Sequence, residues 1–582
     1  MLRALPLRLL RLKCIVNIAL VLLILSACGG GERGGNHAAS YASVAINTAV
    51  SSGLNSSGPS SVSNSGASNP SSVSTGTAAD RVVLSGVVTY DYVPHHSNHI
   101  GLDYSAIEQR PVRGAVVELL NELGQIQAST LTANNGSYSF SIQKNTLIKV
   151  RAKAQLLNNS SPSWDFKVTD NTAGNALYVL DGSLVSTGTG DSTRSLNAGS
   201  GWDGASYSGV RAAAPFAILD SIYSGVTRLI AAGNKRNLTP LELRWSTKNS
   251  TAVGDYTRGE IGTSFYNGFA IYILGDANRD TDEYDAHVLL HEWGHYLEER
   301  LFRSDSIGGD HSDGELLDLR VAMSEGFANA FSGMMTENPN YADASGAGQG
   351  AGFAFSIGRK NRSIKGFFSE GSIGSVIYNF YSSGINKTEK DFTSIFNLLT
   401  NTSYIESEAL TSIFLFSQQA RKLLPETAGV LMDLLEEQNI FGNDEYGSGE
   451  SNSGGLGITL PVYKTVTANN SPVNICSSSD LGKRNKLGNS QFLKLNITQP
   501  GNYNIRLNKA AGAEMVSRPE FVIYQKGRIL STIQNGVVDN ASTNLNLSNG
   551  IYILEVYDLS NRDTKNTDRN TICFNLRVAV NQ

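Results

Sequence analysis

Residues 286–301, AHVLLHEWGHYLEERL, place His291 and His295 four positions apart, with Glu292 next to the first histidine. On a helix, side chains four residues apart lie on one face, about one turn from each other. That spacing suits two imidazole nitrogens that bind one Zn²⁺ at about 2.0–2.1 Å each. Glu292 lies about 100° round the helix, where its carboxylate can reach a metal-bound water without being a ligand. The stretch therefore predicts a helix that carries part of a zinc centre.

A second predicted helix supplies the candidate for a third ligand. Catalytic zinc needs three protein ligands and an open position, and it lowers the pKa of its water to about 7 so that a carboxylate can take the proton. Residues 316–335, LLDLRVAMSEGFANAFSGMM, read as this helix, and Glu325 lies 30 positions after His295. We favour Glu325 because its neighbours look buried. The neighbours of four acidic rivals do not: Asp310, Asp313, Glu315 and Asp318.

The two helices together resemble a known family. HEWGHYLEERL followed by AMSEGFANAFS is similar to the gluzincin branch of zinc metallopeptidases, over roughly residues 260–385. The metzincin continuation is absent, since Glu298 stands where its glycine would be. In gluzincins a glutamate from a following helix completes a His, His, Glu site. The resemblance implies three ligands and one general base, which are His291, His295 and Glu325 with Glu292 as the base.

Other residues near these helices are candidates for stabilising the oxyanion that forms on a substrate carbonyl. His311 lies in the glycine-rich loop IGGDHSDG between the helices, where it could donate to that oxyanion or stabilise the loop. Gluzincins take this donor from a downstream Tyr or His. SEGSIGSVIYNFYSSG supplies Tyr378 and Tyr381, for which core packing is the competing use. Asn329, one turn after Glu325, is placed to hydrogen-bond a histidine ligand.

The loop GDANRDTDEYD, residues 275–285, precedes the first helix and has acidic or amide side chains at alternate positions, namely Asp276, Asn278, Asp280 and Asp282. That is the spacing of oxygen ligands in a Ca²⁺ loop, although Thr281 and His287 stand where such a loop has glycine and glutamate. The alternative is a polar loop that caps the helix and complements its dipole. Both interpretations stay open.

The N-terminus has the features of a bacterial export signal. Basic residues precede the apolar run IVNIALVLLIL, which is short for a transmembrane helix and soon reaches LSAC. This ending resembles a lipobox, which implies that residues 1–27 are a lipoprotein signal peptide and that Cys28 is lipidated. Gly29 after the cysteine then favours the outer membrane. The alternative is an ordinary secretory signal. Residues 28–80, rich in Ser, Gly and Asn, predict a disordered tether.

Two strand-rich regions flank the predicted helices. Residues 81–200 contain alternating runs and resemble carboxypeptidase-regulatory-like β-sandwich modules. Residues 460–582 alternate likewise and resemble the pre-peptidase C-terminal type of sandwich, where Cys476 and Cys573 form an even pair for a disulfide. Residues 205–455 then form a mainly helical, zincin-like domain. The predicted fold class is a multidomain α+β protein with a β-sandwich on either side of a metallopeptidase domain.

Charge and motifs together narrow the function. A net charge of −5 gives no reason to expect a nucleic-acid partner. The motifs indicate a zinc-dependent peptidase, anchored by lipid in the cell envelope, with protein or peptide substrates. The alternative is a surface or periplasmic binding lipoprotein whose middle domain is a degenerate peptidase. The intact His, Glu, His and downstream Glu favour the enzyme, because a degenerate site would more readily have lost Glu292.

Overall fold

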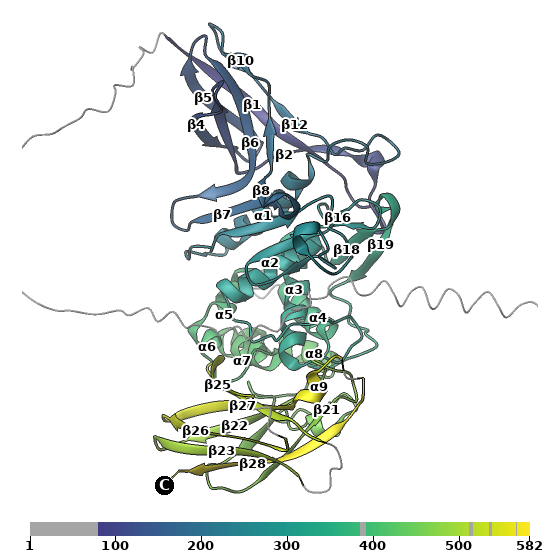
Figure 1. Ribbon diagram of the computed structural model, residues 1–582, viewed down its shortest axis with the longest axis vertical. Coiled ribbons are helices and arrows are strands. Elements are labelled where there is room, and N and C mark those ends of the chain that lie inside the picture. Colours follow the sequence, from purple (N-terminus) through teal and green to yellow (C-terminus); the bar gives the residue numbers. More distant parts are fainter. Residues whose placement is uncertain (1–79, 384–391, 511–515, 535–537, 566, 582) are drawn as a thin grey trace, which may run out of the picture.

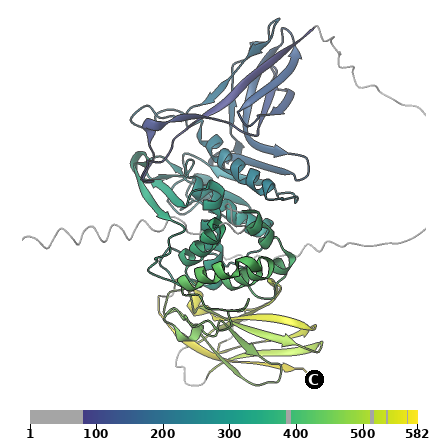
Figure 2. The same cartoon turned by 180° about the vertical axis from the view of Figure 1, so that it is seen from behind.

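The computed structural model describes most of the chain, in five segments: residues 80–383, 392–510, 516–534, 538–565 and 567–581. These residues form three tiers, with N-terminal sheets, a helical middle region and a C-terminal pair of sheets (Figure 1). The view from behind shows the same order (Figure 2). The expected signal peptide, the tether up to residue 79 and Cys28 lie outside the described residues. Among the helices that are described, none is long and apolar enough to cross a membrane.

The N-terminal tier begins with a five-stranded sheet built around the long strand β1. Its alternating buried and exposed residues give β1 one face for the core and one for solvent. The strands of this sheet are β1 (Arg81–Tyr92), β2 (Glu108–Pro111), β5 (Ser137–Gln143), β11 (Ser192–Thr193) and β12 (Leu196–Ala198).

A ten-stranded sheet packs with the first and continues into the middle region, with the strand order β14-β15-β13-β7-β6-β3-β4 and three short strands beside it. Its strands are β3 (Ala115–Leu120), β4 (Ile126–Leu131), β6 (Leu147–Asn158), β7 (Trp164–Asp170), β8 (Ala176–Leu177), β9 (Val179–Asp181), β10 (Val185–Ser186), β13 (Leu241–Trp245), β14 (Phe265–Tyr266) and β15 (Ala270–Ile273). Strands β14 and β15 pair antiparallel as a short hairpin.

The expected domain boundary between residues 200 and 205 falls inside this sheet. Strand β13 pairs in parallel with β7, and the helix α1 (Ala214–Ala231) lies between them in the sequence. Parallel neighbours need such a crossover, so the chain leaves the N-terminal strands, forms α1 and returns to the same sheet. One continuous buried cluster accordingly includes apolar residues of both regions, from Val82 to Phe416 and beyond.

The middle region is partly helical. It contains α2 (Ala286–Arg300), α3 (Leu319–Thr336), α4 (Glu370–Ser382), α5 (Phe392–Leu399), α6 (Thr402–Ile405), α7 (Ile413–Leu423) and α8 (Ala428–Glu437). Two glycines set the close approach of the central three. A Cβ on Gly294 of α2 would lie 3.2 Å from the Phe331 ring of α3, and one on Gly326 of α3 would lie 2.7 Å from the Glu370 carbonyl of α4.

A small antiparallel sheet covers the start of α2. It consists of β16 (Gly275–Asp276), β17 (Asp280–Thr281), β18 (Asn340–Ser345) and β19 (Ala351–Ser356) in that order. The loop before α2 and the segment after α3 therefore belong to one sheet, although more than 50 residues separate them in the chain.

The C-terminal tier consists of two sheets around their own buried core. One has the order β20-β22-β27-β24-β25 and the other β21-β28-β23-β26. The strands are β20 (Tyr463–Val466), β21 (Val473–Ser478), β22 (Ser490–Ile497), β23 (Gly501–Lys509), β24 (Pro519–Gln525), β25 (Arg528–Ile533), β26 (Asn540–Leu547), β27 (Gly550–Asp558) and β28 (Thr571–Val580), and the short helix α9 (Leu559–Arg562) follows β27.

The predicted cysteine pair is a disulfide within this tier. Cys476 on β21 faces Cys573 on β28 across the antiparallel ladder, and their sulfur atoms are bonded. The bridge joins strands 97 residues apart in the sequence, so it closes most of the sandwich into one covalent loop.

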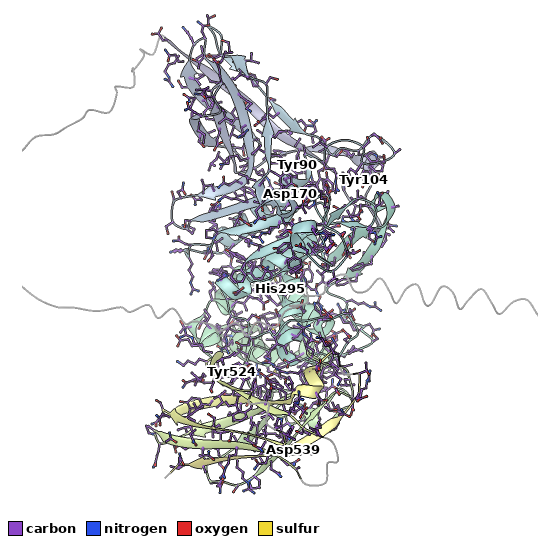
Figure 3. The ribbon with its side chains drawn as sticks, viewed as in Figure 1. Tyr90, Tyr104, Asp170, His295, Tyr524 and Asp539 are labelled. Carbon is purple, nitrogen blue, oxygen red and sulfur yellow. A yellow bond between two sulfur atoms is a disulfide. The ribbon has the colours of Figure 1, made fainter. Side chains whose placement is uncertain are left out.

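A buried ion-pair network fixes this sandwich to the middle region. Arg320, at the start of α3, is fully buried and donates through two nitrogens to the Glu555 carboxylate of β27, at 2.7 and 3.0 Å. Asp318 accepts from the same guanidinium at 2.8 and 2.9 Å. Tyr524 of β24, which faces the helices, donates to Glu555 (Figure 3). The helix that carries Glu325 thus begins at the sandwich interface.

Candidate metal centre

Helix α2 is held by apolar contacts on the side away from its histidines. Trp293 and Leu290 are buried against α1, where Gly225 leaves room for the indole. A Cβ on Gly225 would lie 2.5 Å from that ring. With this face fixed, His291 and His295 face α3, and His295 lies in the middle tier of the molecule (Figure 3).

Three side-chain atoms from α2 and α3 form a nearly equilateral triangle. The Nε2 atoms of His291 and His295 are 3.1 Å apart, and they lie 3.3 and 3.2 Å from Oε2 of Glu325. Tetrahedral bonds of about 2.0–2.1 Å place two ligand atoms about 3.3–3.4 Å apart. The triangle therefore has the size of three ligands around one tetrahedral zinc ion. The three side chains are buried or nearly so, and His295 is the most accessible, at 18%.

The outer nitrogens of both histidines have oxygen partners. Nδ1 of His291 lies 3.0 Å from Oδ1 of Asn329, and Nδ1 of His295 lies 3.1 Å from Oε2 of Glu298. Both oxygens can accept a hydrogen bond from Nδ1. That arrangement would leave the Nε2 lone pairs to face the centre of the triangle. Ser324 donates to Glu298 at 2.6 Å and so helps to orient its carboxylate.

Glu292 lies beside the triangle without being part of it. Its Oε1 is 4.0 Å from Nε2 of His291, and its Oε2 accepts from the backbone N–H of Tyr266 on β14 at 2.8 Å. Burial raises the pKa of this carboxyl. A carboxylate with a raised pKa, fixed by one backbone donor, is suited to take and release a proton.

The structure brings His311 to the same place. Its Nε2 lies 3.2 Å from Oε2 of Glu325, and its Nδ1 lies 2.7 Å from Oε2 of Glu370, at the start of α4. Burial alone would lower the pKa of His311, but Glu325 and Glu370 raise it to about 9. The ring therefore offers a hydrogen-bond donor beside the triangle.

Tyr378 and Tyr381 are not brought to the triangle. Helix α4 touches α3 near Gly326 through Glu370, and Tyr378 packs against Gly333, seven residues further along α3. Eight residues of α4 separate Glu370 from Tyr378, which corresponds to about 12 Å along the helix. Both tyrosines are buried in the helical core with their rings 5.8 Å apart. The residue of α4 that reaches the neighbourhood of the triangle is Glu370, which contacts Nδ1 of His311.

The loop before α2 gathers acidic side chains in a different set from the one expected. Asp280 and Asp282 join Asp343 of β18, with one carboxylate oxygen of each within 4.8 Å of the others. Asp276 and Asn278 do not share this buried position, since Asp276 is half-buried and Asn278 is exposed. Asp276 accepts instead from the Asn278 backbone in a local turn. Burial, together with the nearby charge of Asp285, raises the pKa of Asp280 to about 7. Burial and the neighbouring carboxylates raise the pKa of Asp282 and that of Asp343 well above the usual range.

The alternative role predicted for this loop is to cap the start of α2. The side chain at the N-cap position does not do so. Asp285 is the N-cap residue, yet its carboxylate makes no capping hydrogen bond. It pairs instead with Nε2 of His95 at 2.6 Å and accepts from the Ala344 backbone at 3.1 Å.

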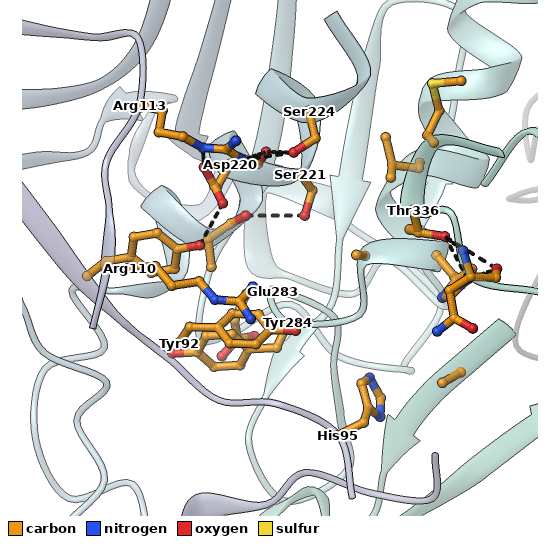
Figure 4. Close-up of a pocket in the computed structure, with 18 of the residues that line it drawn as sticks. Tyr92, His95, Arg110, Arg113, Asp220, Ser221, Ser224, Glu283, Tyr284 and Thr336 are labelled. Carbon is orange, nitrogen blue, oxygen red and sulfur yellow. Dashed lines mark hydrogen bonds and ion pairs between the residues drawn. The ribbon is translucent and has the colours of Figure 1, made fainter. Parts of the chain in front are cut away.

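A separate pocket of about 410 Å³ lies between the N-terminal sheets, the start of α2 and the end of α3 (Figure 4). Its charged groups are already paired. Asp220 accepts from Arg113 at 2.6 Å and from Tyr90 at 2.9 Å, and Arg110 stacks over the Tyr92 ring. His291, His295 and Glu325 do not line this pocket, so the pocket is separate from the triangle.

Sequence reasoning missed three acidic residues at these sites. Glu298 is three residues from His295, so helical spacing could have shown it. Glu370 and Asp343 come from elements 59 residues after His311 and 61 residues after Asp282. No local pattern connects such residues. His287, one turn before His291, is buried with Nε2 3.1 Å from the Asn338 carbonyl.

Comparison with known proteins adds little. No family model and no curated protein matches the chain. Among solved structures, the pre-peptidase C-terminal domain of a Bacillus anthracis collagenase is 15% identical (93% of that chain, TM-score 0.15). CorA, a surface-associated copper-binding protein of Methylomicrobium album BG8, is 10% identical (98%, 0.16), and the lysozyme inhibitor PliG of Aeromonas hydrophila is 10% identical (97%, 0.14). Each covers 20% of this chain, and none shows a zinc peptidase family.

Proposed function

We propose that this protein is a zinc-dependent peptidase. The observation that carries the proposal is the triangle of His291, His295 and Glu325, whose donor atoms are 3.1–3.3 Å apart. Two imidazole nitrogens and one carboxylate oxygen are the donor set of many catalytic zinc sites, which leave a fourth position for water or substrate. Bound zinc supplies Lewis acidity, which polarises a carbonyl and makes water nucleophilic at neutral pH.

Glu292 is the proton carrier in this proposal. It takes a proton from the attacking water and later passes it to the leaving amine. The Tyr266 N–H donates to Oε2 of Glu292, and the other oxygen, Oε1, lies 4.0 Å from Nε2 of His291. The carboxylate therefore stays in place through both transfers.

His311 supplies the donor for the developing negative charge. Glu370 accepts from its Nδ1, which keeps the ring oriented with Nε2 toward the triangle. A fixed donor in a buried site stabilises the charge that develops on the substrate carbonyl oxygen. His311 replaces both tyrosines in this role.

The sheet next to Glu292 favours a peptide substrate. Strand β14, which contains Tyr266, is the last strand at its end of the ten-stranded sheet. An edge strand can pair with an extended peptide through backbone hydrogen bonds. A chain bound along β14 would lie beside Glu292, because the Tyr266 backbone contacts that carboxylate.

The place of action in this proposal is the cell envelope. Cleavage before Cys28 and lipidation of its thiol would anchor the protein in the outer membrane, and the tether would separate the folded tiers from the lipid. Protein or peptide substrates of the envelope are then within reach.

Metal content and casein degradation, measured on ligand variants, test this function. Zinc near one per chain and casein cleavage are expected for the wild type. Loss of both is expected for H295A and E325A. Zinc retention in E325A would move the third ligand elsewhere. A wild-type protein that folds but neither binds zinc nor cleaves casein would support the binding lipoprotein with a degenerate peptidase domain.

A further inference from the structure

Three carboxylates are buried together outside the triangle of His291, His295 and Glu325. Asp280 and Asp282 belong to the loop before α2, and Asp343 belongs to β18. They are 8, 2 and 3% exposed, and one oxygen from each lies within 4.8 Å of the others. Placing three ionised carboxylates this close in a buried site is unfavourable unless a positive charge compensates them.

Among the residues that the structure describes, no side-chain cation compensates the three carboxylates. Across the part of the chain that the structure describes, none of them forms an ion pair with Lys, Arg or His. The basic groups nearby are engaged elsewhere, since Arg211 pairs with Glu283 and His95 pairs with Asp285.

Two oxygens in the cluster lack any partner. Oδ1 of Asp280 and Oδ1 of Asp282 are buried without a hydrogen bond among the described residues. The other oxygen of Asp282 accepts from the Ser264 hydroxyl, which holds the carboxylate in place. Buried acceptors in proteins are almost always satisfied, so such orphans indicate a ligand.

We propose that Asp280, Asp282 and Asp343 bind a calcium ion that joins the start of α2 to β18. All the donors are carboxylate oxygens, with no nitrogen or sulfur, which selects a hard cation over zinc or copper. Calcium bonds oxygen at about 2.3–2.6 Å, so oxygens up to about 4.8 Å apart can touch the same ion. Magnesium is a poorer fit, because it keeps several waters and this cluster is nearly closed to solvent.

The position of the cluster indicates what the ion does. Asp282 is nine residues before His291, and Asp343 lies on the strand that follows α3. The ion would therefore connect the loop just before α2 to β18, the strand that follows α3. Asp285 reinforces this junction through the Ala344 backbone. The ion stabilises the frame of the zinc-type site and contributes no group to it.

Calcium binding and thermal unfolding of the full mature protein, stripped with EGTA, test the inference. One calcium per chain by equilibrium dialysis is expected, with a rise in Tm of several degrees that magnesium does not reproduce. D343N should lose both effects. D276N, in the same loop but outside the cluster, should keep them. Far-UV circular dichroism verifies that each variant is folded.

The wild-type measurement keeps the proposal falsifiable if D343N does not fold. No calcium binding by the wild type, binding that survives in folded D343N, or loss of binding in D276N would each overturn it. The outcome does not depend on the peptidase proposal, because neither calcium binding nor Tm requires zinc or activity.

Discussion

Lys486 of the C-terminal sandwich donates to the backbone carbonyl of Asp310 at 2.6 Å. Asn485 beside it donates to the carbonyls of Gly308 and Asp310 at 3.0 and 3.2 Å. The Lys486 and Asn485 side chains thus hold the loop that ends at His311, whose ring lies against Glu325. The sandwich therefore takes part in positioning a residue of the candidate site, although no sandwich residue belongs to the triangle.

Lys486→Ala should lower kcat without removing zinc. The variant loses a charge-assisted hydrogen bond to the His311 loop, and a loss of about 1.4 kcal/mol in transition-state stabilisation would give about a tenfold fall. Steady-state kinetics and zinc analysis provide the measurement. Lys483→Ala is the matched control, because Lys483 donates to Ser560 within the sandwich. Equal kinetics for the two variants would show that the loop does not need this contact.

His311→Ala should reduce kcat by about 10²–10³ and leave zinc bound, because it removes a donor to the oxyanion but no ligand. Glu370→Gln should have a smaller effect, since the amide oxygen can still accept from Nδ1 of His311. Kinetics with a chromogenic peptide measure both. If His311→Ala abolishes zinc binding instead, His311 is a ligand and the triangle is incomplete.

Asn329→Ala should weaken zinc binding about 10–100-fold, because Nδ1 of His291 loses the oxygen that orients its ring. Asn329→Asp retains an oxygen acceptor at that position and should restore most of the affinity. Competition with a fluorescent zinc chelator gives the dissociation constants. An alanine variant with wild-type affinity would show that His291 is oriented by other contacts.

Glu555→Gln should destabilise the protein by about 3–5 kcal/mol at neutral pH, because it removes a buried carboxylate that pairs with both Arg320 and Arg562. Arg320 then keeps Asp318 as a charged partner, and Arg562 loses its ion pair with Glu555. Although burial opposes it, Arg320 and Arg562 hold the pKa of Glu555 well below its usual range. The stabilising contribution is therefore complete above the ordinary pKa of about 4.5 and is lost as pH falls below it.

Urea unfolding from pH 7 to pH 3 measures this difference. The wild type and Glu555→Gln should converge in stability as the solution becomes acidic. Glu406→Gln is the control, since Glu406 forms an exposed pair with Lys526. A difference that stays constant with pH would contradict the assigned ion pair.

Local spacing was enough to find the residues that lie on α2 and α3. His291, Glu292 and His295 follow from one helical turn, and Glu325 follows from a second helix with buried neighbours. The disulfide followed from counting cysteines in a chain that the sequence predicts to be exported. Strand alternation predicted sheets on both sides of a partly helical middle region.

Longer-range features were not predictable in the same way. The parallel pairing of β13 with β7 carries one sheet past residues 200–205, and no signal in the short run LELRW names its partner. Tyr378 and Tyr381 lie on the expected helix, but their distance from the site depends on where α4 first touches α3. Asp343 completes the acidic cluster from another strand, which alternation within the loop could not reveal.

Zinc content and peptide hydrolysis, measured together on the wild type and on Glu292→Gln, test the central claim most directly. Glutamine keeps the shape of the side chain and an oxygen that can accept from Tyr266, but it cannot take a proton from water. The account predicts one zinc per chain in both proteins and hydrolysis by the wild type alone. A variant that retains most of the wild-type kcat, or a folded wild type without zinc, would contradict it.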